Sequence, residues 1–452
     1  MIEFKHLQNT DPEVYNLVME EYNRQNNCLE LIASENEPSE AVLEAQASYH
    51  TLKYAEGYPG KRYYGGCRII DKTEQLAIDR VCKLFNCKFA NVQPHSGASA
   101  NTAVQFALVQ PGGKIMGMSL NSGGHLTHGA KPTFSGKYYH IKQYEVDEET
   151  YLINYEHLET QMLNFRPRLF IAGASAYSRE IDFKKLRQIV DRVNNETLID
   201  IKKDYEVYQD KIEENGIDYI INRYKKEKCY FMVDMAHIAG LVAADLHQSP
   251  IPYADVVTST THKTLRGPRG GIILTNNAEI AKKINSAVFP GCQGGPLENI
   301  IAAKAVCFGE ALKPEFKEYM ENVVCNTKQL AHTLKNLGVN VLTDGTDNHL
   351  LLLDLRNTNT TGAELESRLE EVGIISNKNA IPFDTEKKTV TSGLRLGAAA
   401  VTSRGLGINE MYIIANIIYK CIVGTVDEFN LIKNELISQV QNICKKYPLY
   451  SD

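Results

Sequence analysis

The sequence predicts an α/β fold in which a large domain built on a mostly parallel sheet precedes a smaller C-terminal α/β domain. From about residue 91 to about residue 303, short apolar runs alternate with helical segments, which is typical of parallel strands buried on both faces. From about residue 310 onward, longer helical segments accompany a strand candidate at 350–355 and a short strand pattern around Arg395. A chain of 452 residues is long enough to bury two such cores.

An N-terminal helical arm is expected over residues 1–45, because apolar residues recur there at roughly helical spacing in a polar background. The large domain, 46–305, begins with a Gly- and Tyr-rich segment, 54–66, that predicts an irregular loop, and a helix is expected at 73–85. Its clearest strand candidates are the apolar runs 169–172, 230–233, 254–257 and 271–274.

The smaller domain, 306–452, has its strand candidate at 350–355 and long helical patterns at about 310–337 and 408–446. In the large domain, the stretch at about 194–228 breaks the alternation of strands and helices, because it is charged and rich in tyrosine. The near-helical spacing of its apolar residues predicts a helical insertion on the surface, after a helix that ends near residue 193.

The composition argues against several function classes. The net charge of -6 is spread along the chain, so no basic face predicts nucleic-acid binding. The ten cysteines form no CxxC pair, so we expect no metal site. No apolar run approaches the roughly 20 residues of a membrane span. Because the chain begins without a secretion signal and its cysteines are scattered, a cytoplasmic location is expected.

Lys263 is the first candidate for chemistry, because it follows a buried strand pattern and precedes a Gly/Pro-rich loop. Burial of an ammonium is costly and depresses its pKa, so that the neutral amine can attack a carbonyl. Thr260 and His262 flank it, and such side chains bind phosphate and carbonyl oxygens. A lone lysine is more often a surface residue, so the other motifs have to decide between the two interpretations.

Four other motifs are each weak alone. Asp234 ends a strand candidate and can pair with a protonated pyridine nitrogen, although such an aspartate is more often a helix N-cap. The small-residue turn at 96–101 opens an apolar helix, whose N-terminus can bind phosphate. Arg395, between glycines, can grip a carboxylate through two parallel hydrogen bonds. Two loop histidines, His125 and His128, can pack on a cofactor ring or move protons.

The order of these motifs is that of a fold-type I enzyme dependent on pyridoxal phosphate (PLP). Longer strings, within a match over about residues 10–430, resemble the serine hydroxymethyltransferase family. The strings that carry the resemblance are Leu31–Asn36, Lys53–Gly66, Asn91–Gly97, Gly124–Gly129, Val233–His237, Thr260–Thr264 and Phe289–Pro296. The resemblance implies a seven-stranded sheet in the large domain.

The resemblance also implies the reaction. The hydroxymethyl carbon of serine would pass reversibly to tetrahydrofolate, which gives glycine and 5,10-methylenetetrahydrofolate. PLP would be the cofactor, held as an aldimine, and tetrahydrofolate the co-substrate. A homodimer, or a tetramer built from it, would share active sites between its subunits.

Carried over by position, the resemblance implies that Lys263 forms the Schiff base with PLP and that Asp234 pairs with the pyridine nitrogen. His125 would stack on the ring, and Glu56 would be the acid–base group. The other implied cofactor contacts are Ser96, Gly97, Ala98, Ser175, His237, His262, Tyr54, Gly294 and Gly295. The implied catalytic set is completed by Thr260, His262 and Tyr64.

For the substrate, the resemblance implies that Arg395 grips the carboxylate with help from Ser34. The other implied substrate contacts are Tyr64, Glu56 and His237. The implied folate contacts are Leu120, Gly124, His125, Leu126 and Asn379. The neighbouring subunit would supply Tyr54, Glu56, Tyr64, Gly294 and Gly295.

Two features depart from the family pattern. Ala98 stands where a second serine hydroxyl is common, and one neutral hydrogen bond is worth about 0.5–1.5 kcal/mol, so weaker PLP retention is expected unless Ser99 compensates. The insertion at 194–228 is absent from the usual family chain. Two alternatives stay open at this point: a PLP-dependent aldolase of the threonine aldolase type that does not use folate, and a non-catalytic protein that kept the fold.

Overall fold

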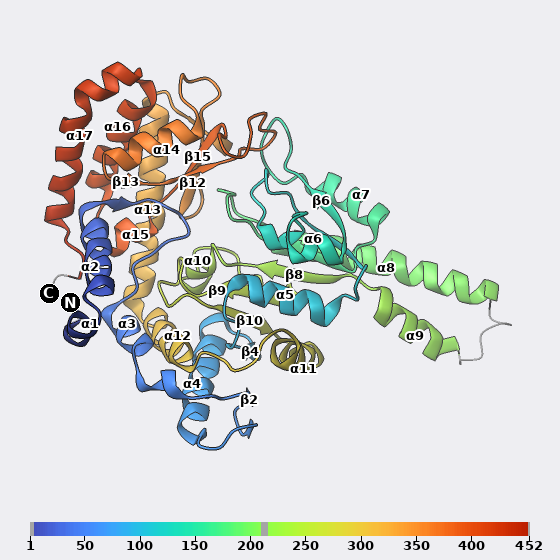
Figure 1. Cartoon of the computed structure of the whole chain (residues 1–452). Coiled ribbons are helices and arrows are strands. Elements are labelled where there is room, and N and C mark those ends of the chain that lie inside the picture. The colour runs from blue at the N-terminus through green and yellow to red at the C-terminus, as the bar shows by residue number, and fades with distance from the viewer. Residues whose placement is uncertain (1–3, 209–215, 451–452) are drawn as a thin grey trace.

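The computed structural model describes residues 4–208 and 216–450 (Figure 1). Its main sheet has seven strands in the order β4-β10-β9-β8-β7-β5-β6. These strands are β4 (Phe89–Asn91), β5 (Lys114–Met118), β6 (His140–Tyr144), β7 (Leu169–Ala172), β8 (Tyr230–Asp234), β9 (Val256–Thr260) and β10 (Gly271–Thr275). Strand β10 is antiparallel to both of its neighbours, and the other pairings are parallel. The prediction of a mostly parallel seven-stranded sheet is confirmed.

Helices cover both faces of this sheet, which is why its central strands are apolar throughout. In β7, Leu169 and Ile171 point into one core while Phe170 and Ala172 point into the other. The first core is closed by α5 (Gly97–Leu108) and α11 (Ala278–Ser286). The second is closed by α4 (Arg68–Phe85), α7 (Tyr155–Phe165), α8 (Phe183–Tyr208) and α12 (Glu298–Ala311).

A second, antiparallel sheet in the order β11-β12-β15-β14 lies in the C-terminal part of the chain. Its strands are β11 (Asn340–Val341), β12 (Leu350–Asp354), β14 (Asn377–Asn379) and β15 (Gly393–Gly397), and its helices are α14 (Gly362–Glu371), α15 (Ala399–Ser403), α16 (Ile408–Val423) and α17 (Val426–Lys446). Helix α13 (Pro314–Asn336) packs Met320 into the large core and Leu330 into the C-terminal one. The domain boundary at 305/306 therefore stays a prediction.

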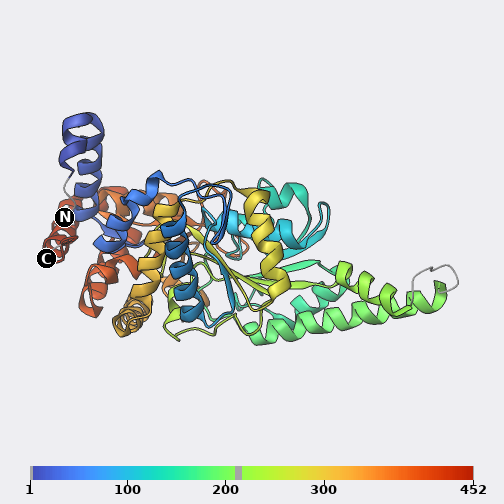
Figure 2. The ribbon, with the colours of Figure 1, turned by 90° about the horizontal axis from the view of Figure 1, so that it is seen from below.

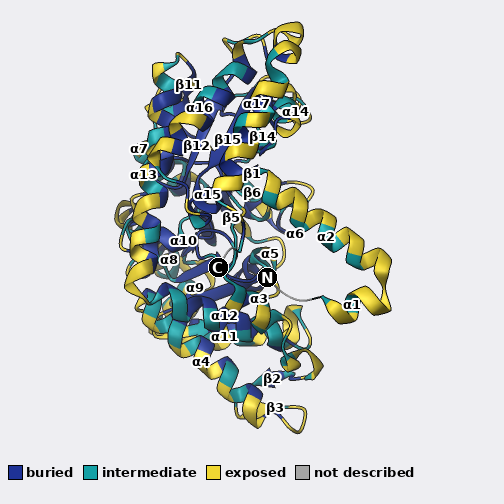
Figure 3. Ribbon diagram, turned by 90° about the vertical axis from the view of Figure 1, so that its left-hand side faces the viewer, coloured by how far each residue is buried: buried dark blue, intermediate teal, exposed yellow. Residues whose placement is uncertain are grey.

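The N-terminal segment is helical only in part. Helices α1 (Lys5–Thr10) and α2 (Pro12–Asn27) have no buried residue, and Figure 3 shows them standing away from the body of the protein. The chain then runs as β1 (Leu29–Glu30), which pairs with β13 (Ile374–Ile375), before α3 (Glu40–Gln46). Leu29 and Leu31 join the C-terminal core, so this segment ties the start of the chain to its end.

Three boundaries differ from the predictions. Helix α4 begins at Arg68, and the loop before it contains the two-residue strands β2 (Gly57–Tyr58) and β3 (Lys61–Arg62). The long C-terminal helical pattern is two helices, because Thr425 caps the start of α17. The helix expected to end at 193 instead continues to Tyr208, since Thr197 and Ile201 extend its buried stripe.

The predicted insertion is a helical pair that projects from one end of the molecule (Figure 2). Helix α9 (Gly216–Glu227) packs against the outer half of α8 and has no buried residue. Arg168 donates to the carbonyls of Lys225 and Lys228 and so attaches the returning chain to the sheet. Residues 209–215 of the insertion lie outside the described residues. No helix in the described part of the chain has the length and apolarity to cross a membrane.

Candidate active site

A cavity of about 410 Å³ lies at the carboxyl ends of β8 and β9, which is where parallel α/β sheets bind their ligands. It collects most of the site residues predicted from the sequence. Those that line it are Ser34, Ser96, Gly97, Ala98, His125, Ser175, Asp234, His237, Thr260, His262, Lys263 and Arg395. The N-terminal segment, the main sheet and the C-terminal sheet therefore all contribute side chains to one site.

Lys263 lies three residues after β9, in a turn that holds its side chain against the cavity. The turn is fixed by Asn36, whose side-chain amide donates to the Lys263 carbonyl at 2.8 Å. The side chain is 8% exposed, and burial lowers its pKa to about 8, an effect that Asp234 opposes. A substantial fraction of the amine is therefore neutral near pH 8 and able to attack a carbonyl.

Asp234 ends β8 and faces the same cavity with an ionised carboxylate. Its Oδ2 accepts hydrogen bonds from Asn101 Nδ2 at 2.7 Å and from His128 Nε2 at 3.0 Å, and its Oδ1 accepts from the Ala236 N–H at 3.0 Å. Although burial works in the opposite direction, these donors hold the pKa of Asp234 well below its usual range. The site thus presents a permanent negative charge at this point.

His128 orients the carboxylate of Asp234 through a hydrogen bond. Its Nδ1 accepts from the His125 N–H at 3.3 Å, so its Nε2 carries the proton donated to Asp234. Ligand atoms of His125, His128 and Asp234 lie within 4.8 Å of one another, a spacing that a metal ion could also use. The prediction of no metal stays a prediction.

His125 and His237 are two further buried imidazoles on the cavity wall. Burial lowers the pKa of His125 to about 4, so its ring is neutral and suited to stacking on a flat ligand. His237 Nδ1 lies 3.3 Å from Nε2 of His349, and the two rings stack with centroids 5.4 Å apart. Burial also lowers the pKa of His237, and that of His349 to about 3.

The part of the cavity lined by Ser96, Gly97 and Ala98 suits an anion. Ser96 caps α5, and its Oγ accepts from the Ser99 N–H at 3.1 Å, so the first N–H groups of the helix point toward the cavity end formed by Gly97 and Ala98. His262 also lines this cavity, and its Nδ1 is buried without a hydrogen-bond partner in the described chain. A helix N-terminus beside an orphaned imidazole nitrogen fits a phosphate group.

Ser99 is the nearest hydroxyl in sequence that could replace the one missing at Ala98. Its Oγ lies 3.0 Å from Ser96 Oγ, and Ser99 is not among the residues that line the cavity. The structure therefore favours Ser96 as the hydroxyl closest to a bound phosphate, and the expectation of weaker PLP retention stays a prediction.

Arg395 reaches the cavity from β15 as a buried cation. Within the described chain its guanidinium donates only to neutral oxygens, namely Ser175 O at 2.8 Å, Asn377 Oδ1 at 3.2 Å and Ser34 Oγ at 3.3 Å. Burial lowers its pKa to about 10, so the group is still charged at neutral pH. The negative charge of Glu35, on the same cavity, partly opposes this effect, but Arg395 forms no ion pair in the described chain. A buried arginine without an ion-pair partner is prepared to bind a carboxylate from a ligand.

Five predicted residues gather elsewhere on the same chain and do not line this cavity. The rings of Tyr54 and Tyr64 lie 4.8 Å apart, and both side chains are exposed. A Cβ at Gly294 would lie 3.3 Å from Glu56 Oε1, and one at Gly295 would touch the Tyr54 ring at 3.1 Å. These five residues, named the Tyr54 cluster here, form a compact patch that does not include Lys263.

The predicted folate residues other than His125 also lie outside the cavity lining. Leu120, Gly124 and Leu126 belong to the loop after β5, and Asn379 ends β14. Gly124 is required by packing, because a Cβ there would come within 2.1 Å of Met118 O. Leu126 is about half exposed. That these four residues contact folate stays a prediction.

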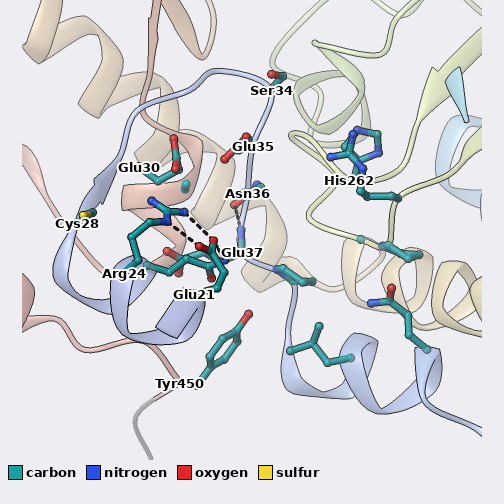
Figure 4. A pocket seen from close by; sticks show the side chains of 18 residues that line it. Glu21, Arg24, Cys28, Glu30, Ser34, Glu35, Asn36, Glu37, His262 and Tyr450 are labelled. Atoms are coloured by element: carbon teal, nitrogen blue, oxygen red, sulfur yellow. Dashed lines mark hydrogen bonds and ion pairs between the residues drawn. The ribbon is translucent and has the colours of Figure 1, made fainter. Parts of the chain in front are cut away.

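A second cavity of about 510 Å³ adjoins the first and shares Ser34, Glu35, His262 and Arg269 with it. Figure 4 shows the acidic side chains on its wall, with Arg24 paired to Glu21 at 2.8 Å. Burial raises the pKa of Glu30 to about 8 and that of Glu37 to about 7. The wall of this cavity is therefore less negative at neutral pH than its composition indicates.

The sequence did not single out the functions of Asn101 or His349. Asn101 connects Asp234 to Thr127 and Thr258 through hydrogen bonds of 2.7–2.8 Å, and its place at the end of the small-residue turn 96–101 was its only signal. His349 precedes β12 and left no signal, because its contact with His237 spans 112 residues.

Comparison with known proteins agrees with this site. A family model described as serine hydroxymethyltransferase matches residues 7–220 and 206–418, and the overlap of the two matches falls in the insertion. A serine hydroxymethyltransferase of Marinomonas sp. (strain MWYL1) is 54% identical over 443 residues, which cover 97% of this chain and 96% of that protein. Serine hydroxymethyltransferase 2 of Ralstonia nicotianae is 52% identical with the same coverage. The chain belongs to the serine hydroxymethyltransferase family, whose members depend on PLP and use tetrahydrofolate as co-substrate.

Proposed function

We propose that the cavity around Lys263 transfers the hydroxymethyl carbon of serine reversibly to tetrahydrofolate. One observation carries this proposal: a lysine with a lowered pKa, an ionised aspartate and an arginine without an ion-pair partner in the described chain line the same cavity. A PLP enzyme acting on an amino acid needs all three groups, one each for the cofactor aldehyde, the pyridine nitrogen and the substrate carboxylate.

The cofactor would lie between the two ends of the cavity. Ser96 and the start of α5 would hold its phosphate, Asp234 its pyridine nitrogen, and the neutral ring of His125 would stack on its face. When bound, PLP supplies an electron sink for the α-carbon of the amino acid. Asn101 and His128 keep Asp234 ionised, which that electron sink requires.

Arg395 would fix the amino-acid substrate. Two parallel N–H donors on its guanidinium match a carboxylate, and Ser34 and Asn377 hold that guanidinium in one orientation. A substrate held at its carboxylate presents one bond of the α-carbon to the reaction, which is a positioning effect. His237, supported by His349, lies on the same wall and would contact the substrate or cofactor oxygen atoms.

Glu56 would move the proton at the serine hydroxyl, and we place it in the site of a partner subunit. Tyr54, Tyr64 and Gly294 are exposed, and no member of the Tyr54 cluster lines the cavity of its own chain, which supports this arrangement. A homodimer in which each chain offers its Tyr54 cluster to the other would complete two equal sites.

We also propose a cytoplasmic location, because all ten cysteines are free thiols.

Hybrid oligomers test the proposal. Lys263→Ala and Glu56→Gln are each expected to be inactive alone, whereas a refolded mixture should regain serine- and tetrahydrofolate-dependent activity, since one site of each hybrid pairs Lys263 with an intact Glu56. If Glu56 acted on the Lys263 of its own chain, no hybrid site would be complete and no activity would return. Cleavage of β-hydroxy amino acids without any transfer to tetrahydrofolate would contradict the proposed reaction itself.

A further inference from the structure

Helix α12 places a buried lysine behind the phosphate end of the cavity. Lys304 is 1% exposed, and its Nζ donates to the carbonyls of Val92 at 2.7 Å, Gly271 at 2.9 Å and Pro94 at 3.1 Å. Burial lowers the pKa of Lys304 to about 7, but only the charged ammonium has three N–H donors for three acceptors. The geometry thus favours a cation compensated by carbonyl oxygens.

These carbonyls belong to the two segments that shape the phosphate turn. Val92 and Pro94 lead directly into Ser96, and Gly271 N donates to Pro94 O at 3.0 Å. A Cβ at Gly271 would lie 2.3 Å from Ser96 O, so the start of β10 presses on the cap of α5. Lys304 therefore holds together the strand and the turn from which the first N–H groups of α5 are presented.

A second hydrogen-bonded side chain holds the turn from the other side without adding a positive charge. Gln93 donates to Gly57 O at 2.9 Å and to Glu74 Oε1 at 2.8 Å. Glu74 in turn pairs with Arg62 at 2.6 Å, and Arg62 also contacts Asp71 and Glu298, so carboxylates outnumber cations at that end of the network. The charges of Glu74 and Glu298 favour the charged form of Lys304. Lys304 is the contact that brings a cation to the turn itself.

The charge of Lys304 also acts on a residue that lines the cavity. His262, which lines the phosphate end, has its pKa lowered to about 3, chiefly by burial and then by the charges of Lys263, Arg269 and Lys304. A cation that acts on His262 acts on a phosphate placed beside it, because Lys304 and His262 are largely buried and the charge between them is weakly screened.

We propose that Lys304 is a positioning residue for the cofactor phosphate, which holds the turn before Ser96 in its binding shape and places a positive charge behind it. The proposal rests on the proposed function, since it requires PLP with its phosphate at the start of α5. A lysine that served only the fold would stabilise the protein, but it would not make a ligand with a phosphate bind more tightly than the same ligand without one.

The test compares PLP with pyridoxal, which lacks the phosphate. Both are titrated into the cofactor-free full-length protein, and binding is followed by the absorbance of the bound aldehyde and by fluorescence quenching. Lys304→Met removes the charge and the donors at similar length. Lys317→Met, at an exposed position on α13, is the matched control. Circular dichroism and thermal unfolding report on the fold of each variant.

Lys304→Met is expected to weaken PLP binding by roughly tenfold or more, the effect of one lost charge-assisted interaction, and pyridoxal binding by less than about threefold. The PLP-to-pyridoxal preference should therefore fall, whereas the control keeps it. If the methionine variant does not fold, Lys304→Gln, which retains two donors, should show the same fall.

Equal weakening for both aldehydes, or an unchanged preference, would overturn the role of Lys304. That failure is distinguishable from failure of the proposed function. If the wild-type protein shows no preference for PLP over pyridoxal, the cofactor assignment is wrong. If the wild type shows the preference and both Lys304 variants keep it, only the role of Lys304 is wrong.

Discussion

Replacing Arg395 by lysine tests the carboxylate site with little change in charge. The guanidinium reaches oxygens of Ser175, Asn377 and Ser34 at 2.8, 3.2 and 3.3 Å, from three different segments of the chain. A lysine has one donor atom and cannot hold these acceptors while also presenting two parallel donors to a ligand. Loss of one charge-assisted hydrogen bond costs about 1.5–3 kcal/mol, so the KM for serine should rise roughly 10- to 150-fold.

The assay measures initial rates against serine concentration at saturating tetrahydrofolate, together with the absorbance of bound PLP. The absorbance should be retained, because Arg395 is assigned to the substrate and not to the cofactor. Arg404→Lys is the matched control: Arg404 is equally buried, but it donates to carbonyls of the N-terminal arm and α17, such as Cys28 O at 2.7 Å. That variant should lose stability and keep its serine KM. An Arg395→Lys enzyme with a wild-type KM for serine would refute the assignment.

Three further outcomes are expected. Ala98→Ser should tighten PLP binding by roughly 2- to 10-fold in an equilibrium titration, since one neutral hydrogen bond is worth about 0.5–1.5 kcal/mol, and unchanged binding would mean that the added hydroxyl does not reach the phosphate. The rate at which cofactor-free protein captures PLP should rise with pH through about 8, because burial lowers the pKa of Lys263 to that value and only the neutral amine attacks; a flat profile from pH 7 to 9 would contradict this. Asn101→Ala removes the 2.7 Å hydrogen bond to Asp234, so PLP binding should weaken by roughly tenfold and acid unfolding should begin at higher pH. The ionised carboxylate of Asp234 stabilises the fold at pH values above its unfolded pKa, and this stability is lost as the pH falls toward its folded pKa. Without the Asn101 hydrogen bond the folded pKa is less depressed, so the loss is complete at a higher pH. An acid-unfolding curve that did not move would count against the Asn101 contact.

Local sequence patterns predicted the buried strands of the main sheet. The runs 169–172 and 271–274 match β7 and β10 to within a residue. Both strands are buried on their two faces, so the apolar run in the sequence covers the whole strand. The helix end predicted at 193 was wrong, because the charged surface of α8 hid a buried stripe that continues through Ile201. Helix boundaries on a partly exposed surface are set by what packs beneath them, which a local pattern does not contain.

The sequence by itself determined the chemistry of this protein: a lysine after a buried strand, an aspartate at the end of another, and strings that place the chain in its family. Only the tertiary structure decided how these residues are supported. The contacts of Asn101 with Asp234, of His349 with His237 and of Lys304 with the carbonyls before Ser96 join positions far apart in the chain. Residue type and spacing report which groups are present, but a hydrogen bond between distant segments exists only once the sheet has brought them within about 3 Å.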